Sequence, residues 1–283
     1  MPRRPNIDEP VSRLAAWSRR LAVFALVAVI ISVIVVRGDL FEIMPAMAMF
    51  ASALALAGLA MLLALGAAVT IWRQGLGGIG RAALGFFLGA ILLAYPGYLA
   101  LRAYSLPPVR DVTTDTARPP RFEVAARLRP RGTNEYQPSN AALQRSGYPD
   151  IMPLQVLQPP AAAYEAALAV VRKHKWVVVD ARPPQGRREG SIEAVARSLI
   201  MGFRDDVVIR VAALGAGSQI DIRSASRYGW HDAGANASRV RQLLEEIDDA
   251  TSGEVKLTPE RKPAPVQRPP AQQRQPQRQP ANR

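Results

Sequence analysis

The sequence predicts an α+β protein in which three N-terminal transmembrane helices precede an antiparallel four-stranded sheet with two helices on one face. Three long uncharged apolar stretches occupy the first third of the chain. Further along, four short segments of alternating apolar and polar residues lie between two amphipathic helical segments. These patterns divide the chain into a membrane anchor at 1–102, a partly packed extended linker at 103–160, an α+β soluble domain at 161–250 and a disordered tail at 251–283.

The apolar stretches are residues 21–36, 43–72 and 82–101. A helix that crosses a bilayer needs roughly 17 to 25 mostly apolar residues. The first stretch is marginal, but it gains length if Trp17 lies at the membrane interface and Arg19 and Arg20 extend toward the lipid headgroups. We therefore expect three membrane-spanning helices, with the lipid bilayer as the first partner of the chain.

The arginines predict the orientation of these helices, because short loops rich in Lys and Arg stay on the cytoplasmic side. The N-terminal arm is rich in arginine, the loop near Gly38 holds Arg37 beside two acids, and the loop around Gly75 holds two arginines and no acid. This pattern places the N-terminus in the cytoplasm and everything after Arg102 in the periplasm of a bacterial inner membrane. An alternative interpretation takes 21–36 as a cleaved signal peptide, but the charges that follow interrupt the route to a cleavage site.

The side-chain inventory argues against metal and thiol chemistry. The chain has no cysteine, which excludes disulfides, a thiolate nucleophile and a cysteine-based metal site. Its two histidines, His174 and His231, are too far apart in sequence to form a helical ligand pair. We therefore predict no metal site and no cofactor.

The chain is strongly basic, with a net charge of +13, but the charge is concentrated in the anchor and the tail. Positive charge in the anchor follows from topology and the soluble domain is nearly balanced, so no nucleic-acid partner is expected. The tail is dominated by Pro, Gln and Arg, and such a composition cannot bury enough apolar surface to fold. We expect the tail to be solvated without a partner, or alternatively to act as a weak electrostatic tether to anionic lipid, lipopolysaccharide or cell-wall polymer.

The linker at 103–160 is rich in proline and has few periodic stretches. Several residues toward its end are too apolar for a free linker, namely Tyr148, Ile151, Leu154, Val156 and Leu157. Part of the linker should therefore pack against the domain.

The domain core is predicted as helix, four strands and helix. Apolar residues recur at helical spacing in 161–173 and 235–247. Period-two alternation or β-branched runs indicate strands at 176–180, 188–199, 206–212 and 218–226. Short turns between the strands favour an antiparallel meander whose apolar face is covered by the two helices.

The other face of this sheet is expected to be exposed to water. It would display a mixed-charge set, namely Glu193, Arg197, Arg210, Asp221 and Arg223. The favoured register of the last hairpin places Ile209 opposite Ile222 and Arg210 opposite Asp221, as an exposed ion pair. The alternative register has a two-residue turn at Leu214 and Gly215, and it is disfavoured because leucine is poor where a tight turn needs positive φ.

Two glycine patterns lie in the anchor. Gly75, Gly77 and Gly80 spell GxGxxG, but they connect two membrane helices and lack the βαβ context of a dinucleotide site. Gly85 and Gly89 form a GxxxG pair that lets the third helix approach a neighbour closely and offers a surface for homo-oligomer formation.

The most distinctive motifs of the chain occur in the linker and the domain. They are DVTTD at 111–115, YPDIMPL at 148–154, DDVVIRV at 205–211, RSASR at 223–227 and DAGAN at 232–236. Through these ordered motifs the chain resembles the bacterial and plastid DUF1499 family, a domain of unknown function. The resemblance implies a family assignment and no activity, because the family has no established one.

The polar residues around these motifs are the candidate site. They form either a structural network or a ligand-binding site, and comprise Asp206, Arg210, Asp221, Arg223, Arg227, Asp232, Asn236 and Arg239. Asp232 or Asn236 is expected to cap the last helix, and Arg227, Arg239 or Arg241 to pair with carboxylates at the strand ends.

No residue of this set is predicted to be catalytic. Asp205 and Asp206 are neighbours on a strand and point to opposite faces, so they do not form a carboxylate dyad. Ser224 and Ser226 lack a plausible base, because His231 would have to fold back across the turn. The sequence therefore favours a membrane-anchored periplasmic binding or interaction module of the cell envelope. The alternative is a hydrolase or transferase that acts on an envelope substrate.

Overall fold

The computed structural model describes residues 10–40, 42–129, 133 and 135–252. The tail from residue 253 onward and the first arginines of the N-terminal arm lie outside the described residues. Predictions about the order of the tail and its anionic partners therefore stay predictions.

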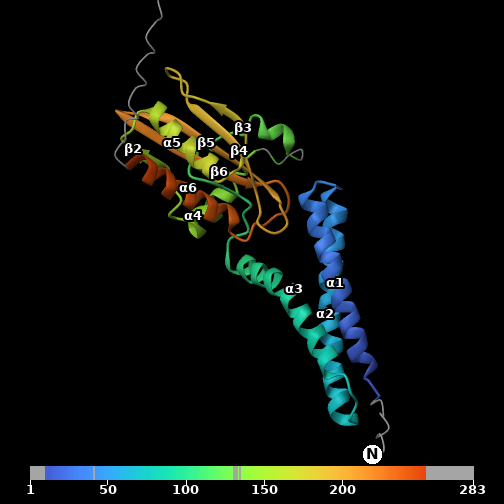
Figure 1. The fold of residues 1–283 in the computed structure, drawn as a ribbon. Helices are drawn as coiled ribbons and strands as arrows, with labels where there is room; N and C mark the ends of the chain where they lie inside the picture. The colour runs from blue at the N-terminus through green and yellow to red at the C-terminus, as the bar shows by residue number, and fades with distance from the viewer. Residues whose placement is uncertain (1–9, 41, 130–132, 134, 253–283) are drawn as a thin grey trace, which may run out of the picture. The chain divides into compact units, whose positions relative to one another are not determined.

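The three apolar stretches form helices α1 (Arg13–Arg37), α2 (Ile43–Gln74) and α3 (Ile79–Ser105), which are labelled in Figure 1. All three are long and apolar enough to cross a membrane. α1 begins before Trp17, which confirms that the first span is longer than its apolar stretch. α3 contains Pro96, and its ribbon bends in the C-terminal part, as expected where proline removes a backbone donor.

Gly85 and Gly89 let α3 pack tightly against its two neighbours in the same chain. A Cβ atom at Gly85 would collide with Ser18 of α1, and one at Gly89 would lie 2.6 Å from Cγ of Met61 in α2. Ser18 also donates a hydrogen bond to the carbonyl of Ala60, 2.9 Å away. The predicted close approach is confirmed within one chain. Homo-oligomer formation through these glycines stays a prediction, and their packing against α1 and α2 argues against it.

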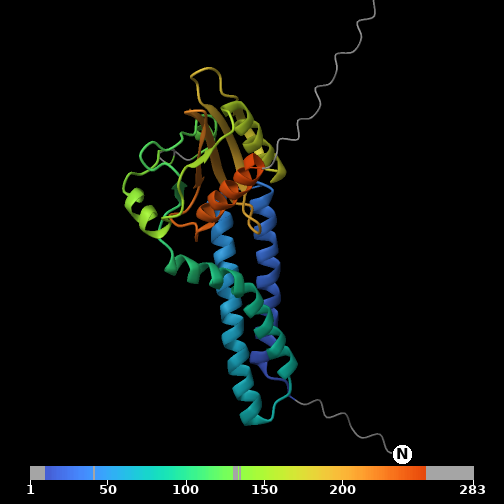
Figure 2. The same cartoon turned by 90° about the vertical axis from the view of Figure 1, so that its left-hand side faces the viewer.

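The soluble domain contains the predicted meander. Its strands are β3 (Val177–Arg182), β4 (Gly190–Arg197), β5 (Arg204–Leu214) and β6 (Gly217–Ser226), each antiparallel to the next. Helices α5 (Pro160–Lys173) and α6 (Ala235–Ser252) lie side by side over one face of the sheet, as Figures 1 and 2 show. The α+β class and the two helices on one face are confirmed.

The hydrophobic core lies between this face and the two helices. Ile192, Ile209 and Ile222 of the sheet and Leu243 of α6 are fully buried in it. Alternation along the strands places these side chains on the same face, because successive side chains of a strand point to opposite sides.

The favoured register of the last hairpin is confirmed. Ile209 lies opposite Ile222, and Arg210 lies opposite Asp221. The two strands meet at a turn whose first residue is Gly215, with φ of 58°. A tight hairpin needs positive φ at this position, which glycine adopts without strain.

The sheet has six strands rather than the four predicted. The additional strands are β1 (Asp111–Thr113) and β2 (Leu154–Val156), and both pair antiparallel with β6. The linker also contributes the 3₁₀ helix η1 (Ala125–Leu128) and helix α4 (Asn140–Gly147). The prediction that part of the linker packs against the domain is therefore confirmed.

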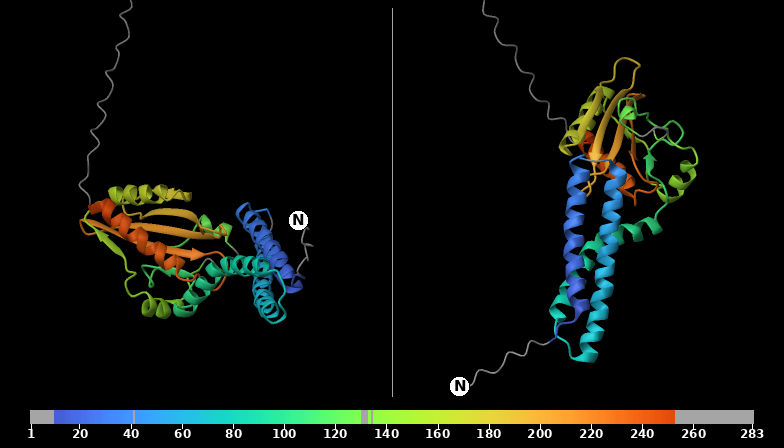
Figure 3. Two further views of the ribbon diagram at one scale, coloured as in Figure 1. Left: turned by 60° about the horizontal axis from the view of Figure 1, so that its bottom comes forward. Right: turned by 90° about the vertical axis from the view of Figure 1, so that its right-hand side faces the viewer.

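The expectation of a water-exposed second face is wrong. Glu193, Asp221 and Arg223 are at most 1% exposed. The segment from β1 to α4 covers them, and it lies on the opposite side of the sheet from α5 in the right-hand view of Figure 3. Of the five charged residues expected on this face, Arg197 lies outside the covering segment and remains exposed. Arg210 is largely buried.

Candidate functional site

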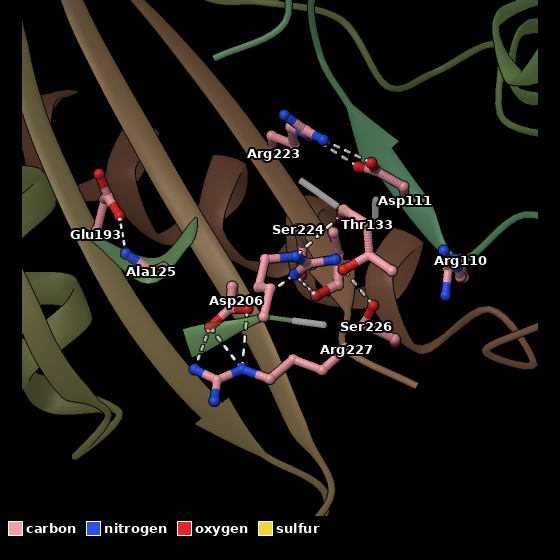
Figure 4. Close-up of polar contacts among 12 residues, drawn as sticks. Arg110, Asp111, Ala125, Thr133, Glu193, Asp206, Arg223, Ser224, Ser226 and Arg227 are labelled. Atoms are coloured by element: carbon pink, nitrogen blue, oxygen red, sulfur yellow. Dashed lines mark hydrogen bonds and ion pairs between the residues drawn. The ribbon is translucent and has the colours of Figure 1, made fainter. Parts of the chain in front are cut away.

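The polar side chains under the cover come from alternate positions of three neighbouring strands. Asp206 and Arg210 of β5, Arg223 of β6 and Glu193 of β4 point away from the hydrophobic core. Figure 4 shows how several of them meet residues of the covering segment. Buried polar and charged groups are stable only when they are hydrogen-bonded, so the contacts of each decide its role.

Asp206 binds two arginines on one buried carboxylate. Arg227 donates to both carboxylate oxygens, from Nε at 3.0 Å and from Nη2 at 2.7 Å (Figure 4). Arg129, which follows η1 in the covering segment, donates from Nη1 at 2.8 Å. It also reaches the carbonyls of Ala225 and Ser226, at 3.1 and 3.0 Å. Burial lowers the pKa of Arg129, and the adjacent charge of Asp206 partly offsets this effect.

Arg223 joins β6 to β1 through a bidentate ion pair. Its Nε and Nη2 lie 2.9 and 2.7 Å from the two carboxylate oxygens of Asp111 (Figure 4). Its Nη1 donates to the carbonyl of Pro120, 3.0 Å away, and its guanidinium stacks over Phe122. Burial and the charge of Asp111 raise the pKa of nearby Tyr136 to about 12.

Glu193 holds the start of η1. Its carboxylate accepts hydrogen bonds from the backbone N–H groups of Glu123 at 2.7 Å, Val124 at 3.1 Å and Ala125 at 2.8 Å. The first N–H groups of a helix have no partner within it, so a carboxylate at this position satisfies them. A buried glutamate on the sheet thus orients the covering segment.

Arg210 connects the hairpin to the DVTTD motif. Its Nη2 lies 2.8 Å from Asp221 and 3.0 Å from Asp115. Burial acts to raise the pKa of Asp115, but hydrogen bonds from the N–H groups of Arg118 and Ala117 and from Arg210 outweigh it and lower the pKa. The predicted ion pair between Arg210 and Asp221 is confirmed, but it is mostly covered rather than exposed.

The other candidate residues lie on the helix side of the sheet. Asp232 accepts from the N–H groups of Gly234 at 2.9 Å and Asn236 at 2.6 Å, which confirms its role as the cap of α6. Burial raises the pKa of Asp232 despite these hydrogen bonds. Gly234 has φ of 78°, a conformation that favours glycine.

Asn236 and Arg239 connect α6 to the strand ends. Asn236 accepts from Ser224 Oγ at 2.7 Å and donates to Ser226 Oγ at 2.9 Å. Arg239 donates to Ser224 Oγ at 2.8 Å and pairs with Asp205 at 2.7 Å. Asp205 and Asp206 therefore bind partners on opposite faces, as predicted.

The structure separates the predicted residues into two groups. Those on the covered face are Asp206, Arg210, Asp221, Arg223 and Arg227, and those on the helix side are Asp232, Asn236 and Arg239. Each has hydrogen-bond partners within the chain, which is the arrangement expected of a structural network. Sequence reasoning missed Asp111, Arg129 and the role of Glu193. Asp111 could have been found, because DVTTD was already a recognised motif, whereas Arg129 carries no such signal.

His231 is not placed to act as a base for a serine. Its Nδ1 accepts from the N–H of Ala233 at 2.8 Å, and its Nε2 lies 3.3 Å from the carbonyl of Leu106. With Nδ1 occupied as an acceptor, Nε2 carries the proton toward that carbonyl. Asp206 lies on the opposite face of the sheet from Ser224, so the structure does not bring Asp206 together with His231 and a serine. Ser226, His231 and Asp232 line one cavity, but the hydrogen bonds of His231 go to the backbone of Ala233 and Leu106 rather than to a serine.

A cavity of about 610 Å³ lies near the helix-side group. Its walls come from α2, α3, the β4–β5 loop and the loop that precedes α6. Its apolar lining includes Met47, Leu99 and Phe203. Its polar lining includes Ser226 and Asp232. Over the residues that the structure describes, no three His, Asp or Glu side chains gather as a metal site would require.

Residues 111–247 match the model of a family described as a protein of unknown function, DUF1499. No curated protein matches the chain. The matched range runs from Asp111 in β1 to Ile247 in α6, so it contains the covering segment together with the sheet and both helices that pack on it. Residues 111–247 of the soluble domain therefore match the DUF1499 family.

Proposed function

We propose that this protein is a membrane-anchored binding module of the bacterial inner membrane that holds an amphiphilic ligand in the 610 Å³ cavity. The observation that carries the proposal is the composition of the cavity wall, to which membrane-spanning helices and the soluble domain both contribute. The volume lies within the roughly 300 to 1,000 Å³ of ordinary ligand pockets.

The apolar part of the cavity suits a hydrocarbon chain. It is lined by Met44 and Met47 of α2, by Leu99 of α3, and by Ile200 and Phe203 of the β4–β5 loop. Methionine side chains are flexible and adapt to apolar groups of varied shape. Because α2 and α3 are candidate membrane spans, a chain in this cavity would come from the bilayer.

The polar end of the cavity suits a neutral or cationic headgroup. Ser226 accepts a hydrogen bond from Asn236, which leaves its hydroxyl proton available to a ligand acceptor. Asp232 adds a carboxylate, and two other charged residues of the lining are paired, Asp205 with Arg239 and Arg204 with Asp39. A phosphate group would meet this carboxylate unfavourably, so a hydroxyl, amide or amine headgroup fits better.

The arginine pattern of the anchor supports a periplasmic position for the domain, at the outer surface of the inner membrane. The hydrolase or transferase alternative is less well supported, because Ser224 and Ser226 contact amide and guanidinium groups rather than a base. Binding is therefore the function that the site supports best.

The test is a substitution that narrows the cavity. Ala103 lines it, and Ala103→Phe adds a ring where the hydrocarbon chain is expected. Full-length protein in neutral detergent is titrated with a fluorescent fatty alcohol, whose headgroup is uncharged. We expect binding to weaken by about tenfold, equivalent to about 1.4 kcal/mol.

Ala94→Phe is the matched control, because Ala94 lies on the exposed surface of α3 and does not line the cavity. It should bind the probe as the parent does. Equal binding by the parent and Ala103→Phe, or equal loss in both variants, would contradict the proposal.

A further inference from the structure

A second hollow, of about 550 Å³, lies between the covering segment and the β3–β4 end of the sheet. It shares no lining residue with the 610 Å³ cavity proposed to hold an amphiphile (the amphiphile cavity), and it lies at a different end of the sheet. β4 begins at this hollow with Gly190 and ends at Arg197, next to the β4–β5 loop that lines the cavity. The two sites are therefore at opposite ends of one strand.

The lining of this hollow is rich in arginine. It contains five arginines and two glutamates, namely Arg118, Arg121, Arg182, Arg188, Arg210, Glu123 and Glu189. No lysine lines it. An arginine guanidinium presents a planar fork of donors that matches the geometry of phosphate and carboxylate groups, which a lysine ammonium does not.

Two of the arginines are fixed by partners within the domain. Arg210 pairs with Asp221 at 2.8 Å and with Asp115 at 3.0 Å. Arg182 pairs with Glu123 at 2.5 Å and with Asp180 at 2.7 Å. Their charges are balanced by these carboxylates, so they attract an anionic ligand less than an unpaired arginine would.

The other three carry the charge that a ligand would meet. Within the described part of the chain, Arg118, Arg121 and Arg188 have no carboxylate within ion-pair distance. Arg118 and Arg121 come from the covering segment and Arg188 from the β3–β4 loop, so segments distant in sequence direct them to one place. Ser191 adds a hydroxyl to the same lining.

We propose that this hollow binds a ligand with two or more phosphate groups. Three arginines without a carboxylate partner line one space, which is more than a single phosphate requires, and the volume admits a diphosphate with an attached group. The site does not depend on the amphiphile cavity, whose polar end carries a carboxylate and favours the opposite charge.

The test is a calorimetric titration of the full-length protein, in neutral detergent, with inorganic pyrophosphate. We expect pyrophosphate to bind about tenfold more tightly than inorganic phosphate, because it engages more of the three guanidinium groups. The double variant Arg121→Gln with Arg188→Gln should weaken pyrophosphate binding by at least about tenfold.

The matched control is the double variant Arg145→Gln with Arg172→Gln. Both residues are exposed, on α4 and α5, and neither lines the hollow. The control removes the same net charge and should bind pyrophosphate within about twofold of the parent. Equal weakening in both double variants, or no pyrophosphate binding by the parent, would overturn the proposal.

A second arm identifies the source of the phosphate. The parent is placed in nanodiscs of neutral or anionic phospholipid, and pyrophosphate binding is measured in each. Weaker pyrophosphate binding in anionic nanodiscs would show that lipid headgroups compete for the hollow and are its ligand. Equal binding in the two kinds of nanodisc would assign the hollow to a soluble ligand. Both results support a phosphate site. Ala103→Phe changes only the amphiphile cavity, so it should bind pyrophosphate as the parent does. The proposal of an amphiphile site and the proposal of a phosphate site can therefore fail independently.

Discussion

Asp206 contributes a buried negative charge that is stable only while its two arginines are present. Asp206→Ala would leave Arg129 and Arg227 buried without a carboxylate. We expect the free energy of unfolding to fall by about 3–5 kcal/mol, because the remaining charges are desolvated and uncompensated. Denaturant unfolding of the full-length protein in neutral detergent, followed by tryptophan fluorescence, measures this loss of stability.

The control for this change is Asp150→Ala. Asp150 also pairs with an arginine, Arg241, but both side chains are about half exposed, at 52% and 42%. An exposed pair contributes about 0 to 1 kcal/mol. Similar losses in the two variants would show that the covered network contributes no more than a surface ion pair.

Asp232 gives a prediction about pH. Burial raises its folded-state pKa above the ordinary value of 3.8. Its contribution to stability is therefore fully present below pH 3.8 and is lost as pH rises through the folded-state pKa. Asp232→Asn cannot titrate, so its stability relative to the parent should increase over the same pH range. Thermal midpoints of both proteins across a pH series test this, and a constant difference would contradict it.

At the residue scale, the sequence predicted which side chains are important better than it predicted their partners. Asp206, Arg223 and Arg227 were recognised because they belong to compact motifs on regular strands. Their partners Asp111 and Arg129 lie far away in sequence, in a proline-rich segment without periodicity. Hydrophobic alternation indicates which face a residue occupies, but not whether another part of the chain covers that face.

Among the elements, η1 depends on Glu193 from the sheet. Glu193→Gln keeps the size of the side chain but removes the charge that strengthens the hydrogen bonds from Glu123, Val124 and Ala125. We expect faster hydrogen exchange of these three amides, with little change in the amides of β5. Hydrogen exchange with mass spectrometry measures the effect.

Glu189→Gln is the control for this element. Glu189 is about half exposed beside Arg210 and accepts no backbone hydrogen bond among the described residues. Its substitution should leave exchange in 123–125 unchanged. If both variants accelerate exchange there, the effect comes from the general charge of this region rather than from the cap.

The accuracy of the element predictions followed element length. Strands β4, β5 and β6 are long enough to show alternation, and α5 and α6 show helical stripes, so all were predicted near their observed bounds. β1 and β2 are three residues each and show no period. They form because β6 offers unpaired edge groups, which is a property of the assembled sheet and not of either segment.

At the scale of the whole molecule, the orientation of the anchor is open to a direct test. Three spans and a cytoplasmic N-terminus place Ser252, the end of α6, in the periplasm. Alkaline phosphatase fused after Ser252 should be active, because this enzyme folds only where its disulfides form. A fusion after Gly77, between α2 and α3, should be inactive. The reverse pattern would invert the topology.

The pairing of β1 with β6 has a consequence for the order of events during synthesis. Asp111 and Arg223 are 112 residues apart, and β1 leaves the ribosome long before its partner strand exists. The hairpins of the meander close over short distances, whereas the joining of β1 to β6 must close a long loop, which is slow. Arg227 lies close in sequence to Asp206 and can meet it as soon as β6 forms, but Arg129 arrives only when the earlier segment folds back. The segment from β1 to η1 is thus synthesised first but packs onto the sheet last. The sheet and its covering segment cannot be complete until β6 has been synthesised.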